Sequence, residues 1–151
     1  MHFHLALGIQ YHFSQHMAHK GVINIHPSLL PKYRGLAPYF WSLINGETET
    51  GVTIHWVDKG FDTGDILVQQ SVPITPNDTI ISLSNKCAKL GSYLLIEAVN
   101  LIKQDNPPRT PQKKRGEGSY YSWPTPSDLR LFKQRGHRYG SFIYMWKKLT
   151  E

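Results

Sequence analysis

The sequence has little cysteine and lacks long hydrophobic runs. Its 151 residues include a single cysteine, Cys87, so no disulfide can form within the chain. Such usage is typical of a reducing compartment, and we expect the chain to be cytoplasmic. No apolar run approaches the roughly 18 residues of a membrane-spanning helix, and the run Leu5–Ile9 is too short for a signal peptide. We therefore expect no membrane partner.

Acidic residues are scarcest after residue 106. Residues 107–151 carry ten Lys or Arg and three Asp or Glu, a net charge of +7, whereas residues 1–106 have a net charge of −1. Aromatic residues, Trp123 among them, interleave with these cations. Such a segment could bind RNA through phosphates and stacked bases, or it could wrap the body of the protein. We favour wrapping, with Trp123 buried, because so many rings need burial.

The stretch from residue 21 to residue 64 holds three side chains that can do chemistry together. Residues 22–25 are β-branched and apolar apart from Asn24, which predicts a buried strand. Pro27 cannot donate to a ladder, so the strand should end at His26. Asn24 and His26 are two apart and should share a face. Asp62 follows in a loop bracketed by Gly60 and Gly64, which allows close backbone approach.

An amide, an imidazole and a carboxylate suit acyl transfer to an amine. Asn24 and a protonated His26 could stabilise the oxyanion of a carbonyl under attack. The carboxylate of Asp62 would favour the charged imidazole and could relay the proton that the amine loses. The alternative is that Asn24 and His26 merely cap the end of a strand.

The segments Gly21–Gly35 (GVINIHPSLLPKYRG) and Gly51–Gly64 (GVTIHWVDKGFDTG) resemble the folate-dependent formyltransferases, over roughly residues 3–104. The resemblance implies catalytic roles for Asn24, His26 and Asp62, with N10-formyltetrahydrofolate as co-substrate and no metal. It also implies an α/β fold: the C-terminal half of a Rossmann-like formyltransferase domain, a mixed sheet flanked by helices. We expect a partial catalytic domain at residues 1–106 and a basic C-terminal extension at residues 107–151.

The resemblance further implies folate contacts along the loop after the first motif and near the second. The loop around Lys32–Gly35 lies over the folate or the acceptor in the family. Asp58 is a second candidate for the catalytic carboxylate. In the family, however, the catalytic residue is the Asp directly before Thr-Gly, which favours Asp62. The residues expected to bind folate are Ser28, Leu29, Leu30, Tyr33, Gly35 and Asp58.

Periodicity predicts the remaining elements. A long amphipathic helix should span residues 79–104, with Asp78 as its N-cap and Cys87 buried as a structural thiol on its apolar stripe. His55 should be a satisfied interior histidine and not a catalyst. The other predicted elements are helices at Pro38–Asn45 and Ser127–Arg135 and strands at Gly51–Val57 and Asp65–Ile74.

The first twenty residues raise two further expectations. Phe3–Gln10 should form a strand whose neighbouring units in the family have no counterpart here, so we expect self-association through this exposed edge. His12 and His16 are spaced for one helix face and could hold a metal, but no Glu or Cys accompanies them, and we favour a solvated segment.

The leading function is formyl transfer to an amine acceptor. A short tail stands where the methionyl-tRNA enzyme carries a separate tRNA-binding domain, which favours a small amine or an amino sugar as acceptor. Two alternatives stay open: a methionyl-tRNA formyltransferase, and a non-catalytic fragment that binds folate or a partner.

Overall fold

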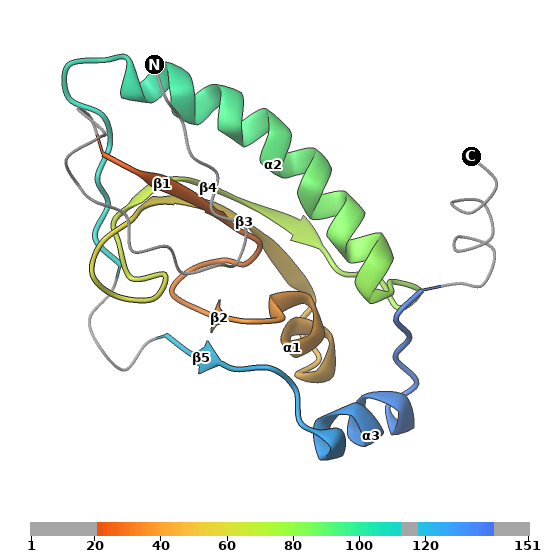
Figure 1. The fold of residues 1–151 in the computed structure, drawn as a ribbon. Coiled ribbons are helices and arrows are strands. Elements are labelled where there is room, and N and C mark those ends of the chain that lie inside the picture. Colours follow the sequence, from red (N-terminus) through yellow and green to blue (C-terminus); the bar gives the residue numbers. More distant parts are fainter. Residues whose placement is uncertain (1–20, 113–117, 141–151) are drawn as a thin grey trace, which may run out of the picture.

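The computed structural model describes residues 21–112 and 118–140, which form both strands and helices (Figure 1). The bounds of the strands and helices predicted within these ranges agree with the structure to within two residues, and two further strands, of two residues each, were not predicted. In chain order the elements are β1 (Ile23–His26), β2 (Arg34–Gly35), α1 (Pro38–Ile44), β3 (Glu49–Trp56), β4 (Ile66–Pro73), α2 (Ile80–Ile102), β5 (Tyr120–Tyr121) and α3 (Pro126–Gln134). An antiparallel sheet has the order β1-β3-β4, and β2 pairs with β5 in parallel.

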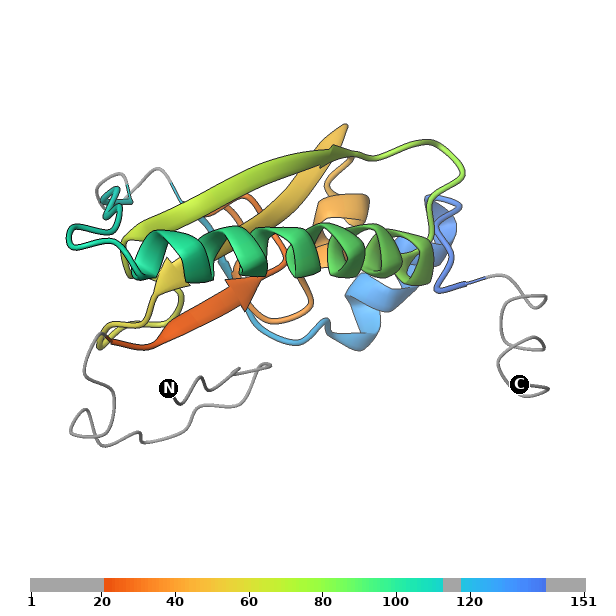
Figure 2. The ribbon, with the colours of Figure 1, turned by 90° about the horizontal axis from the view of Figure 1, so that it is seen from above.

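The antiparallel sheet has one apolar and one polar face, because side chains alternate along a strand. Ile54 and Trp56 of β3 are buried in one cluster with Leu94 and Ala98 of α2. Figure 1 shows α2 along this face and the chain around β2 and β5 beneath the other, and Figure 2 shows α2 running the length of the sheet. The apolar face therefore holds the core, and the polar face is left for chemistry.

The start of α2 corrects one prediction. Thr79, not Asp78, is the N-cap: its backbone is extended and its hydroxyl accepts the amide hydrogen of Ser82. The Asp78 carboxylate instead accepts from the Thr75 amide nitrogen at 2.8 Å and pairs with Lys86. The prediction was wrong by one residue because Asp and Thr are both good caps, and the preceding turn already occupies the carboxylate.

Cys87 is confirmed as a buried thiol. Its side chain is 2% exposed and lies in the cluster beneath α2. Burial raises the pKa of Cys87 to about 12, so the thiolate that would act as a nucleophile is disfavoured.

The described part of the basic extension packs on the body of the protein. β5 pairs with β2, and Phe132 of α3 is fully buried with Phe40 and Leu83, stacked on Phe40 at 4.7 Å between ring centroids. Wrapping is thus confirmed for these residues. The expected burial of Trp123 is wrong: its side chain is 69% exposed, because it lies in the turn before α3 while Phe132 fills the core.

Several expectations fall outside the described residues. These are the strand at Phe3–Gln10, the pair His12 and His16, and the last aromatic residues from Phe142 to Trp146. Self-association through the N-terminal edge therefore stays a prediction. Among the helices that the structure describes, none is long and apolar enough to cross a bilayer.

Phe132→Ala should lower the free energy of unfolding by about 3 kcal/mol or more, because it empties a fully buried aromatic site between α3 and α1. Trp123→Ala removes an aromatic ring of larger size from the surface and should cost less than about 0.5 kcal/mol. Urea unfolding of both variants and the parent measures the difference. Equal losses would contradict the packing of the extension described above.

Candidate active site

The polar face of the sheet brings two histidines and an asparagine together. Asn24 and His26 lie two residues apart on β1, and the antiparallel register places Asn24 opposite His55 of β3. The Nδ2 of Asn24 lies 3.3 Å from the Nε2 of His55. His26 and His55 are both almost fully buried, at 4% and 2% exposed. Buried imidazoles need partners, and the loop after β3 supplies one.

Asp62 is the shared partner of these three side chains. Its Oδ1 accepts from Nδ2 of Asn24 at 3.3 Å and lies 3.5 Å from Nε2 of His55, while its Oδ2 lies 3.5 Å from Nδ1 of His26. The amide nitrogen of Gly35 also donates to Oδ2, at 2.8 Å. The structure brings Asn24, His26 and Asp62 together, as the sequence predicts.

The loop conformation that delivers Asp62 depends on close backbone contacts. Asp62 has φ 53°, in the left-handed region that Asp tolerates better than most residues. A Cβ atom on Gly64 would collide with the carbonyl oxygen of Trp56, so only glycine allows the loop to return this close to β3.

Two side chains from other segments hold the backbone of this loop. Gln112 donates from Nε2 to the carbonyl oxygens of Asp62 at 2.9 Å and Gly64 at 2.8 Å. Arg34 donates from Nε to the same Asp62 oxygen at 3.2 Å and to Oε1 of Gln112. The site therefore includes a residue of the C-terminal extension.

The charge of Asp62 is stabilised by its contacts. Burial by itself would raise the pKa of Asp62, but its contacts with His55, with His26 and with the Gly35 amide outweigh burial and bring the pKa to about 2. For His26, burial dominates and lowers the pKa despite the nearby Asp62. At neutral pH the resting cluster thus holds an ionised Asp62 beside a neutral His26.

Contacts with backbone carbonyls decide which ring nitrogens carry hydrogen, since a carbonyl oxygen only accepts. Nε2 of His26 lies 2.7 Å from the carbonyl oxygen of Tyr33, and Nδ1 of His55 lies 2.9 Å from that of Trp56. In the neutral rings, Nδ1 of His26 and Nε2 of His55 are then unprotonated and face Asp62. The cluster can consequently take up one proton.

Two of the residues expected to bind folate have buried side chains with structural partners. Ser28 is fully buried, and its hydroxyl donates to the carbonyl oxygen of Lys32 at 2.7 Å. Leu30 is 3% exposed, and its amide donates to the hydroxyl of Thr53 at 3.1 Å. These contacts fix the path of the loop between β1 and β2.

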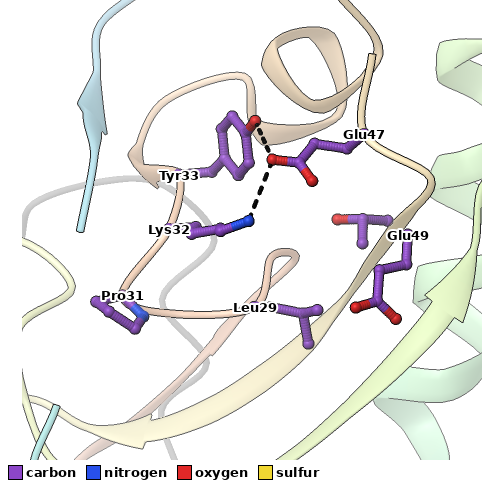
Figure 3. Close-up of a pocket in the computed structure, with 7 residues that line it drawn as sticks. Leu29, Pro31, Lys32, Tyr33, Glu47 and Glu49 are labelled. Carbon is purple, nitrogen blue, oxygen red and sulfur yellow. Dashed lines mark hydrogen bonds and ion pairs between the residues drawn. The ribbon is translucent and has the colours of Figure 1, made fainter. Parts of the chain in front are cut away.

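Leu29 and Tyr33, from the same loop, line a cavity of about 310 Å³ (Figure 3). Lys32 and Glu47 also line it, and Glu47 accepts from the hydroxyl of Tyr33 at 2.8 Å. Tyr33 has φ 60°, and its carbonyl oxygen points to His26. The loop thus contributes a backbone carbonyl to the reactive cluster and side chains to this cavity.

Asp58, the rival carboxylate, bonds within its own loop. It is exposed, and its Oδ1 accepts from the amide of Gly60 at 2.9 Å and from the hydroxyl of Thr63 at 2.6 Å. Gly35, in contrast, is in direct contact with Asp62.

A second cavity, of about 460 Å³, opens beside the reactive cluster. It is lined by Arg34, Phe61, Thr63 and Tyr120. Arg34 precedes Gly35, and Phe61 and Thr63 flank Asp62, so the cavity is lined by chain neighbours of two residues of the cluster. Phe61 and Tyr120 meet edge-on at 6.1 Å between ring centroids and are both more than half exposed.

Sequence reasoning missed two contributors to the cluster. His55 is buried, as predicted, but it also contacts Asn24 and Asp62. Its position on the same strand face as Thr53, opposite Asn24, would have revealed this only with the strand register known. The contacts of Gln112 could not be predicted from any local pattern, because they reach Asp62 and Gly64, which lie 50 and 48 positions earlier in the chain.

Comparisons with known proteins agree with the motifs. A family model described as "Formyl transferase" matches residues 9–99. A methionyl-tRNA formyltransferase of Desulforamulus reducens is 52% identical over 96 residues, which make up 64% of this chain and 30% of that protein. The chain thus spans less than a third of the length of this curated relative.

Solved structures give the same fold. An N-formyltransferase from Helicobacter canadensis, solved with folinic acid and dTDP-3-aminofucose, is 35% identical with a TM-score of 0.63, over 70% of this chain and 38% of that one. The formyltransferase PseJ from Anoxybacillus kamchatkensis, solved with a formamido sugar nucleotide and tetrahydrofolate, is 30% identical with a TM-score of 0.69, over 87% and 68%. The predicted α/β, Rossmann-like fold is confirmed.

Asp62 should make stability depend on pH in acid. Its folded pKa of about 2 lies below the ordinary value of 3.8, so its stabilising effect is present above 3.8 and is lost as the pH falls through about 2. Urea unfolding between about pH 5 and pH 2 should show the parent losing about 2 kcal/mol more than Asp62→Asn. Asp78 also has a pKa of about 2, but it is present in both proteins and cancels. Parallel losses in parent and variant would contradict the clamped carboxylate.

Proposed function

The chain belongs to the formyl transferase family, and from that premise we propose that it moves a formyl group from N10-formyltetrahydrofolate to an amine. The observation that carries the proposal is the convergence on Asp62, which lies 3.3 Å from Asn24 and 3.5 Å from His26. These are the three side chains that the motifs single out. They supply a hydrogen-bond donor, an imidazole and a proton acceptor at one point.

The proposed reaction needs no covalent bond to the protein. The amine nitrogen attacks the formyl carbon, and its new bond to carbon forms as the carbonyl oxygen becomes an oxyanion. Asn24 donates an N–H to that oxygen, and His26 donates from Nδ1 once it is protonated. The proton lost by the amine enters the cluster at His26 and Asp62. The oxyanion then re-forms the carbonyl as the bond from carbon to N10 breaks, and the cluster passes the amine's proton to N10 as tetrahydrofolate leaves.

The cavity beside Asp62 suits the folate co-substrate. Phe61 and Tyr120 offer aromatic surface to a flat ring system, and Arg34 offers a guanidinium to a carboxylate. The proposed folate contacts are this cavity together with the loop from Ser28 to Gly35. Asp58 would act there indirectly, because it holds Thr63 at the rim.

For the acceptor we propose a small amine or an amino sugar. The likeness to PseJ, which was solved with a sugar nucleotide, extends over 87% of this chain and so reaches into the extension. We further propose that residues 107–151 are an extension that braces the catalytic domain. In the described part its side chains hold the loop of Asp62 through Gln112 and the core through Phe132.

A second candidate acceptor is methionyl-tRNA. The observation in its favour is the identity of 52% to a methionyl-tRNA formyltransferase, higher than the 35% and 30% to the two sugar-nucleotide structures. That likeness covers 96 residues, fewer than the chain contains, and tRNA would have to contact the exposed cations of the extension.

His26→Ala and Asp62→Ala should each lower kcat by about 100-fold or more, because each removes a group that holds charge or moves a proton in the transition state. Release of tetrahydrofolate measures turnover. Asp58→Asn is the matched control: it keeps an acceptor for Thr63 and should stay within about 3-fold of the parent. A His26→Ala variant as active as the parent would disprove the assignment. A parent that binds folate but transfers nothing would instead support the non-catalytic alternative.

The acceptor can be identified by comparing a panel of amino-sugar nucleotides with methionyl-tRNA. We expect turnover with an amino sugar, and RNA binding that stays weak at about 150 mM salt. Turnover with methionyl-tRNA alone, with an affinity that falls steeply as salt rises, would favour the second candidate. Arg130→Gln, which changes an exposed cation of α3, should then weaken RNA binding without changing the unfolding midpoint.

A further inference from the structure

The proposed reaction gives His55 no step, although its ring lies at the centre of the cluster. It is 2% exposed, and its Nε2 lies 3.3 Å from Nδ2 of Asn24 and 3.5 Å from Oδ1 of Asp62. A buried polar ring in contact with two reacting side chains restricts how both can lie. His55 also sits within β3, which pairs with strands on both of its edges, whereas Asp62 lies in a loop.

The tautomer of His55 makes Nε2 an acceptor. Nδ1 lies 2.9 Å from the carbonyl oxygen of Trp56 and must donate to it, so Nε2 of the neutral ring has a free lone pair. The two hydrogens of the Asn24 amide nitrogen then go to Nε2 of His55 and to Oδ1 of Asp62. Both partners accept, so the nitrogen end of the amide, and not its oxygen end, faces the carboxylate.

The other end of the Asn24 amide is not anchored. Its Oδ1 is buried and has no hydrogen-bond partner among the described residues. The two ends of an amide have nearly the same shape, so packing alone does not choose between them. Without His55, a single 3.3 Å contact with Asp62 would hold the nitrogen end in place.

We propose that His55 is a positioning residue: its Nε2 accepts one N–H of the Asn24 amide, which leaves the other N–H, here donated to Asp62, to turn to the oxyanion at the reacting centre. This inference rests on the proposed function, since Asn24 is the donor to the oxyanion there. His55 itself needs no contact with the substrates. Its effect passes through Asn24 and through the carboxylate of Asp62.

The kinetic test compares His55→Gln with His55→Leu, two side chains of similar volume. Gln keeps an acceptor oxygen for the Asn24 amide, and Leu does not. We expect His55→Leu to lower kcat by about 10-fold or more with both KM values nearly unchanged, and His55→Gln to recover most of that loss. A packing role alone predicts the reverse order, because a buried Gln costs more than a buried Leu.

His137→Gln is the control, because His137 contacts Phe132 of α3, away from the cluster, and should leave kcat unchanged. Either of two results would overturn the inference: His55→Leu with the kcat of the parent, or equal losses in His55→Leu and His55→Gln. Unfolding midpoints measured alongside separate loss of fold from loss of orientation.

A second readout does not depend on turnover. The ¹⁵N spectrum of histidine side chains, recorded on the parent at about pH 8, where an ordinary imidazole is neutral, should show His55 protonated at Nδ1 and not at Nε2. His55→Gln assigns the signal, and Asn24→Ala should shift Nε2. A His55 protonated at Nε2 would overturn the inference even if His55→Leu does not fold. Should the parent transfer formyl to no amine, the proposed function fails while this spectrum still decides the role of His55.

Discussion

The carboxylate of Asp62 is the point at which segments far apart in the chain meet. β1 contributes Asn24 and His26, β3 contributes His55, and the Gly35 amide donates to the same carboxylate. A buried carboxylate is costly unless hydrogen bonds and opposite charge offset the loss of water. Here the Gly35 amide and the Asn24 amide group donate to the partly buried carboxylate of Asp62, whose pKa stays at about 2. The same contacts that make the charge tolerable also aim the groups of the proposed reaction at one place.

The two faces of the sheet divide stability from chemistry. Beneath α2, Ile54 and Leu94 lie in a continuous apolar cluster that holds the strands in register. On the other face the same register sets Asn24 opposite His55. A shift by one residue would turn the polar side chains into the core and the apolar ones to the site. Packing on one face therefore sets the geometry of the other.

Much of the fold and the three central residues could be predicted from the sequence, because motif spacing and periodicity are local signals. Asn24 and His26 followed from a strand that ends at a proline. The errors arose where contacts between residues far apart in the chain determine which side chains are buried or bonded. Trp123 and Phe132 are both large aromatics in a basic segment, and only the docking of α3 chooses which is buried. The contacts of His55 and Gln112 likewise depend on strand register and on chain return, which no short pattern encodes.

The parallel pairing of β2 with β5 has a consequence for the order of events during synthesis. It joins Arg34 to Tyr120 and Gly35 to Tyr121, and Gln112 reaches back to the loop of Asp62. None of these bonds can exist until the ribosome has released the later partner. The sheet and α2 can assemble earlier, because all their residues precede position 103. A nascent chain can therefore form its core before Gln112 and β5 hold the loops of the cluster in place. A chain arrested at that stage would be folded but would lack these contacts.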